Sequence, residues 1–368
     1  MNCSLHLIGD ALSGDAMMLS YIERHLAAFG IEPERRYLCK KTEALFAAGP
    51  GNETEVQTVL IFCDPDQASL IAREIATDTG DTVTMRNDLL LPSRAVSVRT
   101  GYYKIIETAR EIHVITVHTG HELPPPDLSG RTEETATVHI FDAEENTLPT
   151  VLRQIAEAYR VRYSLSEPIP GWRQCRLTAE RFGDLEGAKQ QLVTHFLTAL
   201  CTDNIAASMI AALEASGKTV SFAESCTGGL LSYFLTRESG ASNVFEGALV
   251  TYSNRLKSSW IAVANNTLEA YGAVSREVVE EMSAGALEVS GADYAVAVSG
   301  IAGPTGGTPQ KPVGTVHVAV RSKDALRTSK LQLHGDRNYI QEQTVLHAVK
   351  MLMLLDKKTF FKFPSGIS

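Results

Sequence analysis

The chain has 368 residues, of which 44% are hydrophobic and 21% are charged, and its formal net charge is −9. These proportions are ordinary for a soluble globular protein, and the length predicts two or three domains. The negative charge argues against a general DNA-binding surface, which needs clustered Lys and Arg. Apolar runs fall short of the roughly 18 residues that cross a bilayer, so we expect no membrane contact.

The spacing of the cysteines and the composition of the first residues indicate in which cellular compartment the protein is found. Scattered spacing without a CxxC pair predicts buried thiols in a reducing environment, and the six positions are Cys3, Cys39, Cys63, Cys175, Cys201 and Cys226. The opening MNCSLHLIGDALSGD lacks the basic and long apolar regions of a signal peptide. We therefore expect a cytoplasmic protein.

Strands alternate with helices in the first third of the chain, which favours a parallel sheet in α/β layers. The expected strands are 5–9, 58–64 and 111–117, and the expected helices are 16–29, stopped by Gly30, and 67–76. The Pro-rich segment at 122–135 indicates a domain boundary.

Residues 136–202 predict a small α+β unit, with strands at 136–142, 162–169 and 172–180 and helices at 147–159 and 186–200. The remainder, 203–368, again alternates the two element types. Helices are expected at 205–216, ended by Gly217, and at 229–239, 276–291 and 339–355. Strands are expected at 219–225, 245–253, 293–303, 314–322 and 329–335.

Four polar segments follow predicted strands in this last region: ESCTGG (224–229), TYSNRLK (251–257), SGIAGPTGG (299–307) and HGDR (334–337). Ligands of open α/β sheets gather beyond the carboxyl ends of strands. We therefore expect these segments to converge on one site.

In ESCTGG, Gly228 and Gly229 let a helix begin close to the strand, and its N–H groups can bind an anion or oxyanion. Ser225 is a candidate nucleophile that needs a base. Cys226 is intrinsically the better nucleophile. Neighbours at a strand end point to opposite faces, so only one of the two reaches the site, and the pattern leaves open which. The structural alternative is a capping turn in which Ser225 and Thr227 satisfy each other's amides.

In TYSNRLK, Lys257 follows a strand and is expected on the first turn of a helix. A lysine in a partly apolar environment loses proton affinity and can act as general base, and serine–lysine pairs are a variant of the catalytic triad. Tyr252 can relay a proton or orient the lysine. The alternative is an exposed lysine on a surface helix, with His334 as a rival base.

SGIAGPTGG combines glycines with hydroxyls, and such a loop can wrap a phosphate or ribose with backbone donors. It is neither a Walker A motif nor GxGxxG. Arg337 in HGDR offers a planar fork for phosphate, or else a surface ion pair with Asp336.

Six ordered motifs across about 205–357 resemble the C-terminal domain of the CinA (competence/damage-inducible) family, which includes nicotinamide-nucleotide amidases. They are AESCTGG, FEGALVTYSNRLK, YGAVSREVVEEM, AVAVSGIAGPTGG, KPVGTV and HGDR. The resemblance implies hydrolysis of nicotinamide mononucleotide to nicotinic acid mononucleotide and ammonia, without a metal or cofactor. It makes Ser225 the nucleophile and Lys257 its base, with Tyr252 beside them. The implied substrate-binding residues are Glu224, Cys226, Thr227, Gly228, Gly229, Gly303, Pro304, Thr305, Gly306 and Arg337.

The resemblance also implies three α/β or α+β domains: a molybdopterin-binding-like domain at 1–135, a KH-like linker domain at 136–202 and the amidase domain at 203–368. The first is linked in full-length members to metal-dependent ADP-ribose pyrophosphatase activity. Its GGLGPTxDD-type loop is missing after the strand TVLIFCD, which leaves Asp10 and Asp15 as isolated acids. We therefore predict that this activity is lost and that the domain serves assembly or regulation.

The family association further predicts a homodimer. The acidic, Pro-containing stretch of the middle region gives no positive sign of RNA binding. Two rival functions stay open at this point. One is a nucleotide-binding regulatory protein of competence or DNA damage without turnover. The other is an ADP-ribose pyrophosphatase that is still active in the N-terminal domain.

Overall fold

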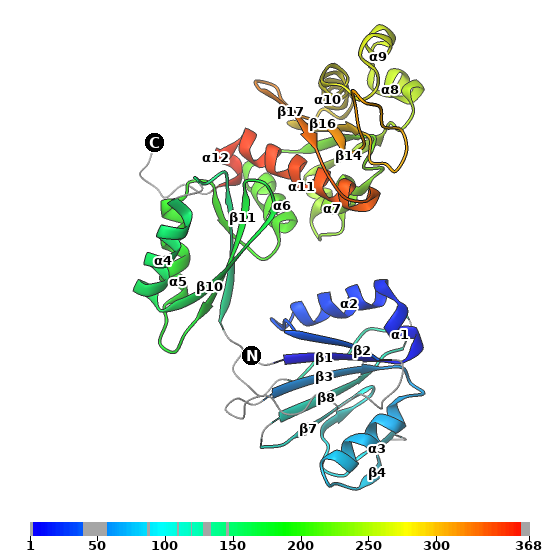
Figure 1. Ribbon diagram of the computed structural model, residues 1–368, viewed down its shortest axis with the longest axis vertical. Helices are drawn as coiled ribbons and strands as arrows, with labels where there is room; N and C mark the ends of the chain where they lie inside the picture. Colours follow the sequence, from blue (N-terminus) through cyan, green and yellow to red (C-terminus); the bar gives the residue numbers. More distant parts are fainter. Residues whose placement is uncertain are drawn as a thin grey trace. The chain divides into compact units, whose positions relative to one another are not determined.

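The computed structural model describes residues 3–39, 57–86, 89–108, 110–118, 120–127, 134–144 and 147–361. The chain divides into two compact units, Met1–Glu133 and Glu134–Ser368, and both combine helices with sheets (Figure 1). Within the described ranges, every helix is too short or too polar to span a membrane.

The first unit is built on a six-stranded sheet with the order β2-β1-β3-β8-β7-β6. Its strands are β1 (Cys3–Ile8), β2 (Arg35–Cys39), β3 (Gln57–Cys63), β6 (Val96–Arg99), β7 (Tyr102–Ile106) and β8 (Arg110–Thr116). The helices are α1 (Asp10–Gly14), α2 (Ala16–Ala27) and α3 (Ala68–Asp78). A separate hairpin pairs β4 (Val83–Arg86) with β5 (Leu89–Pro92).

The predicted parallel sheet forms over β1, β2, β3 and β8, and β7 and β6 extend it antiparallel. Successive side chains of β3 alternate between the faces of the sheet. Leu60 and Phe62 pack on the α2 side, whereas Val59 and Ile61 pack on the α3 side. In Figure 1, α2 and α3 cover opposite faces of this sheet. The sequence patterns missed both hairpins, because their strands are only four or five residues long.

The second unit begins with a four-stranded antiparallel sheet, β10-β11-β9-β12, backed by two helices. The elements are β9 (Thr135–Phe141), α4 (Thr147–Tyr159), β10 (Val161–Ile169), β11 (Trp172–Ala179), α5 (Leu185–His195) and β12 (Ala199–Cys201). The helix predicted over 186–200 was wrong at its end. It stops at His195, because Ala199–Cys201 pairs instead with the edge of β9.

A five-stranded sheet follows, with the order β14-β13-β15-β16-β17. The strands are β13 (Val220–Glu224), β14 (Phe245–Val250), β15 (Tyr294–Gly300), β16 (Thr315–Ser322) and β17 (Leu326–Gln332). The first three are parallel, and β16 and β17 are antiparallel to their neighbours. The carboxyl ends of β13, β14 and β15 therefore lie at one edge.

Helices cover both faces of this sheet. They are α6 (Ile205–Ser216), α7 (Leu230–Thr236), α8 (Asn254–Ile261), α9 (Asn265–Tyr271), α10 (Arg276–Ser290), α11 (Arg337–Leu355) and α12 (Lys357–Phe360), with the 3₁₀ turn η2 (Ala241–Asn243). Val296 and Val298 of β15 pack with α6, α7 and α11, whereas Ala295 and Ala297 pack with α8 and α10. The pattern missed α9, a seven-residue helix.

The predicted linker and amidase segments share one hydrophobic core. Phe141 of β9 and Trp172 of β11 belong to the same buried cluster as Met353 of α11. The ring of Phe141 also lies 5.7 Å, centroid to centroid, from that of Phe361. The sheet of β9 and β11 therefore packs directly on α11 and on Phe361.

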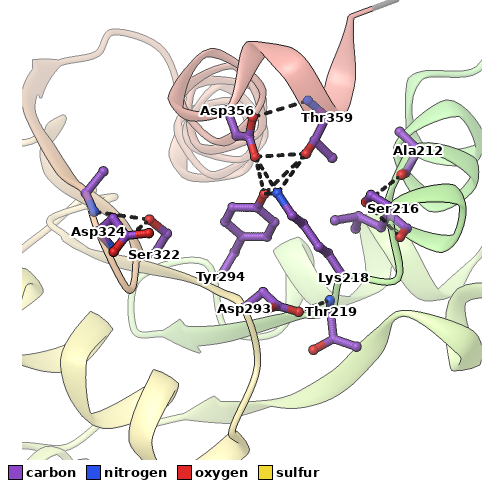
Figure 2. Close-up of polar contacts among 12 residues, drawn as sticks. Ala212, Ser216, Lys218, Thr219, Asp293, Tyr294, Ser322, Asp324, Asp356 and Thr359 are labelled. Carbon is purple, nitrogen blue, oxygen red and sulfur yellow. Dashed lines mark hydrogen bonds and ion pairs between the residues drawn. The ribbon is translucent and has the colours of Figure 1, made fainter.

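A polar cluster fastens α12 to the amino-terminal edge of the five-stranded sheet (Figure 2). Lys218 Nζ donates to Asp356 Oδ2 at 2.6 Å, to Tyr294 OH at 2.7 Å and to Thr359 Oγ1 at 2.9 Å. Tyr294 OH also donates to Asp356. Although burial opposes ionisation, hydrogen bonds from Lys218, Tyr294 and Thr359 hold the pKa of Asp356 well below its usual range.

We expect Asp356→Ala to lower the free energy of unfolding of this unit by about 2 kcal/mol, because it removes charge-assisted hydrogen bonds. Both tryptophans of the chain, Trp172 and Trp260, lie in this unit, so their fluorescence in a urea titration follows its unfolding. The contribution should be present above the ordinary aspartate pKa and be lost as the pH falls below it, since the folded pKa is depressed.

Asp324→Ala is the matched control, because the hydrogen bond from Asp324 to Ser322 uses the backbone N–H and survives the substitution. Equal stabilities of the two variants at neutral pH would contradict this role for Asp356.

Candidate active site

Ser225 and Lys257 meet at the carboxyl edge of the five-stranded sheet. Ser225 directly follows β13, and Lys257 lies in the first half of α8. Lys257 Nζ is 3.0 Å from Ser225 Oγ. The residues are 8% and 1% exposed, respectively. The surface-lysine alternative was therefore wrong, and the pair has the separation that proton transfer requires.

Local sequence places the lysine. Ser253 caps α8 by accepting a hydrogen bond from Leu256 N–H, so the helix begins immediately after β14. Lys257 then points back to the strand end, where its amine also donates to the carbonyls of Thr251 at 2.7 Å and Tyr252 at 3.4 Å. Burial lowers the pKa of Lys257 to about 8. Roughly a tenth of the amine is then neutral at pH 7 and able to accept a proton.

Cys226 faces the other way. Its side chain is buried in the hydrophobic core that α7 and α11 share with the sheet. Burial raises the pKa of its thiol to about 12. The thiol therefore stays protonated, and the structure brings Ser225, and not Cys226, to the lysine.

Glu224 serves the turn itself. This residue is 0% exposed. Its carboxylate accepts from Thr227 Oγ1 at 2.7 Å and from the backbone N–H groups of Gly229, Leu231 and Ser232 at 3.0, 3.1 and 2.9 Å. It also accepts from the Ser232 hydroxyl. We expected the N–H groups at the start of α7 to bind an external anion, but Glu224 occupies three of them.

Tyr252, Arg337 and the glycine loop form the outer part of the site. Tyr252 is 59% exposed, and its hydroxyl accepts from Arg337 Nη2 at 3.1 Å. Arg337 Nη1 donates to the carbonyl of Gly303 at 2.9 Å. The side chain of Tyr252 thus contacts the arginine, and only its carbonyl contacts Lys257. All four predicted segments are linked, because Lys257 contacts Ser225 and Arg337 contacts both Tyr252 and Gly303.

The loop needs glycine at Gly303. Its φ is +84°, and a Cβ there would lie 2.6 Å from Val313 Cγ1. The next peptide bond, to Pro304, is cis. Thr305 and Gly306 are exposed. The rival base His334 follows β17 and is exposed. Its backbone carbonyl accepts a hydrogen bond from the side chain of Gln343.

Two residues near Ser225 were not among the predicted site residues. The hydroxyl of Thr251 is fully buried and has no hydrogen-bond partner in the described part of the chain. Gln341 of α11 donates to the carbonyl of Cys226 at 2.6 Å. Thr251 opens the segment TYSNRLK but was not singled out as a site residue, and Gln341 lies outside the six motifs. A lone glutamine in a long helix carries no local signal for a contact 115 positions away.

The two acids singled out in the first unit have different positions. Asp15 caps α2 by accepting hydrogen bonds from Met17 and Met18 N–H, and Asp10 is exposed in the first turn of α1. Among the described residues, three or more His, Cys, Asp or Glu side chains nowhere gather as metal ligands do.

Comparison with known proteins agrees with the resemblance. Residues 202–355 match the family model of the CinA C-terminal domain. A putative competence-damage inducible protein of Thermoanaerobacter pseudethanolicus is 33% identical over 268 residues, covering 67% of this chain and 64% of that protein. The nicotinamide-nucleotide amidohydrolase PncC of Enterobacter agglomerans is 48% identical over 38% of this chain and 86% of its own length.

A solved structure, the competence/damage inducible protein CihA from Agrobacterium tumefaciens, is 41% identical over 41% of this chain and 93% of that chain, with a TM-score of 0.41. Against five relatives with competence-damage or CinA-like names, this chain spans between 33% and 64% of their length.

Fold and site together define an α/β protein with a buried serine–lysine pair at a sheet edge. The chain belongs to the CinA family.

Proposed function

We propose that the C-terminal part of the chain is an amidohydrolase that converts nicotinamide mononucleotide to nicotinic acid mononucleotide and ammonia. The observation that carries the proposal is the 3.0 Å contact between Ser225 Oγ and the buried amine of Lys257. A relative that covers this segment bears the name nicotinamide-nucleotide amidohydrolase. The reaction belongs to pyridine-nucleotide salvage, and we therefore also propose a cytoplasmic location.

The steps follow from the positions of the two groups. Neutral Lys257 takes the proton of Ser225 while the serine oxygen attacks the carboxamide carbon. The resulting lysine ammonium returns a proton to the amide nitrogen, so that ammonia leaves and an acyl-serine remains. Lysine then deprotonates a water, whose oxygen attacks the ester carbon. The lysine ammonium returns that proton to the departing serine oxygen, which releases the carboxylic acid, the free serine and the neutral lysine.

Substrate binding is assigned to the outer part of the site. Arg337 is bonded to Gly303 and Tyr252, which places its guanidinium between the glycine loop and the tyrosine. A guanidinium has five N–H donors and pairs well with phosphate. We assign the phosphate and ribose to Arg337 and to the loop residues Gly303, Pro304, Thr305 and Gly306.

The test is ammonia release from nicotinamide mononucleotide by the purified full-length chain, with nicotinic acid mononucleotide identified as the second product. We expect both products in equal amounts. Tight binding of the nucleotide without ammonia would instead support the rival function, a regulatory protein that binds nucleotides without turnover.

We also propose that the N-terminal unit lacks pyrophosphatase activity and serves assembly as a homodimer. The missing glycine-rich, paired-aspartate loop supports the loss of activity, and the family association suggests the homodimer. Incubation of the same protein with ADP-ribose and a divalent metal should yield no AMP. Robust AMP formation would restore the rival in which this unit is an active hydrolase.

A further inference from the structure

The turn that carries Ser225 has an almost complete set of backbone hydrogen bonds. The carbonyl of Glu224 accepts from Thr251 N–H, that of Ser225 from Gly228 N–H, and that of Thr227 from Leu230 N–H. Buried backbone groups are nearly always paired, so any group left over deserves an explanation.

Thr227 supplies one such group. Its residue is 3% exposed and its hydroxyl donates to Glu224, but no acceptor for its backbone N–H lies in the described part of the chain. The backbone N–H of Cys226 likewise has no acceptor there, and the Thr227 N–H is the one whose peptide is held by a side chain of α11. A buried, unpaired N–H two residues after a nucleophile is suited to hold the oxyanion of an acyl-transfer step.

Gln341 controls the direction of that N–H. Its Nε2 donates to the carbonyl of Cys226 at 2.6 Å. The carbonyl of Cys226 and the N–H of Thr227 belong to one planar trans peptide, in which they point in opposite directions. Holding the carbonyl toward α11 therefore turns the Thr227 N–H away from α11.

Resting on the amidase function proposed above, the geometry points to Gln341 as a positioning residue for catalysis: it holds the Cys226–Thr227 peptide so that Thr227 N–H donates to the oxyanion. Glu224 also helps to hold Thr227, because its carboxylate accepts a hydrogen bond from the Thr227 hydroxyl. The side chain of Gln341 acts through this peptide and makes no contact with the reacting atoms.

The test compares Gln341→Met with wild type in steady-state ammonia release across pH. Met keeps the length of the side chain but cannot donate to the carbonyl. Loss of an oxyanion donor costs about 10²- to 10³-fold, and a misaligned one should cost roughly 10- to 100-fold in kcat. We expect KM within about 3-fold of wild type and an unchanged midpoint of the pH profile, because Ser225 and Lys257 stay in place.

Gln343→Met is the matched control. It lies on the same helix and its side chain also donates to backbone carbonyls, those of His334 and Tyr339, but it does not contact the serine turn. Its kcat should equal that of wild type. Gln341→Glu, which also keeps the size and loses the donor when ionised, provides a second variant should Gln341→Met fail to fold.

A kcat of the Gln341 variants equal to that of Gln343→Met would overturn the inference while the amidase function stands. A shifted pH midpoint or a raised KM with unchanged kcat would likewise overturn it, by showing that Gln341 acts on Lys257 or on substrate binding. Absence of ammonia from wild type would overturn the amidase function and this inference with it.

Discussion

Ser225→Ala should abolish ammonia release from nicotinamide mononucleotide, with a fall in kcat of at least about 10⁴-fold, as for other nucleophilic serines. The hydroxyl is the only group of Ser225 that Lys257 contacts, and alanine leaves the backbone bond to Val298 in place. The nucleotide should still bind, which calorimetric titration measures, because the proposed phosphate contacts lie elsewhere.

Ser221→Ala provides the comparison. Ser221 is a buried serine of β13, the strand that Ser225 follows, and its hydroxyl donates to the carbonyl of Gly247 at 3.0 Å. The variant tests whether losing any buried hydroxyl from β13 impairs turnover, and we expect it to keep its activity. If Ser225→Ala stayed active and Cys226→Ala did not, the thiol would be the nucleophile and the assignment would be wrong.

Lys257→Met should lower kcat by about 10²- to 10⁴-fold, the range of a positioned general base, and change nucleotide binding far less. Its stability should equal or exceed that of wild type, because burial of the amine disfavours its charged form and methionine carries no charge. Thermal unfolding of the same samples separates this result from misfolding. Lys311→Met removes another lysine-to-carbonyl bond, to Tyr271, and should leave kcat unchanged.

The pH dependence follows from the same amine. Because the pKa of Lys257 is lowered to about 8 and the base must be neutral, kcat/KM should rise with pH through a midpoint near 8. Between about 8 and the ordinary lysine pKa of about 10.4 the unfolded chain binds more protons, so the contribution of Lys257 to stability rises with pH there. Persistent turnover in Lys257→Met would instead make His334 the better candidate for the base.

Local patterns predicted most of the helices and strands, because buried side chains recur every two residues along a strand and every three or four along a helix. The helix 147–159 and the strands around Ser225 follow apolar periodicity and flanking turn residues. Prediction failed where a partner far along the chain decides the outcome. Ala199–Cys201 is a strand because β9 offers an open edge.

The sequence by itself determined the chemical groups of the site and their family, because six ordered motifs place a serine, a lysine, a glycine loop and an arginine after predicted strands. Only the tertiary structure decided how they are used. The order β14-β13-β15 brings Lys257 to Ser225 across 32 positions and buries Cys226. The fold also places the Glu224 carboxylate against the backbone N–H groups at the start of α7. The packing of α11 brings Gln341 to the turn that carries Ser225. Such contacts depend on strand order and helix packing, which no short stretch of residues encodes.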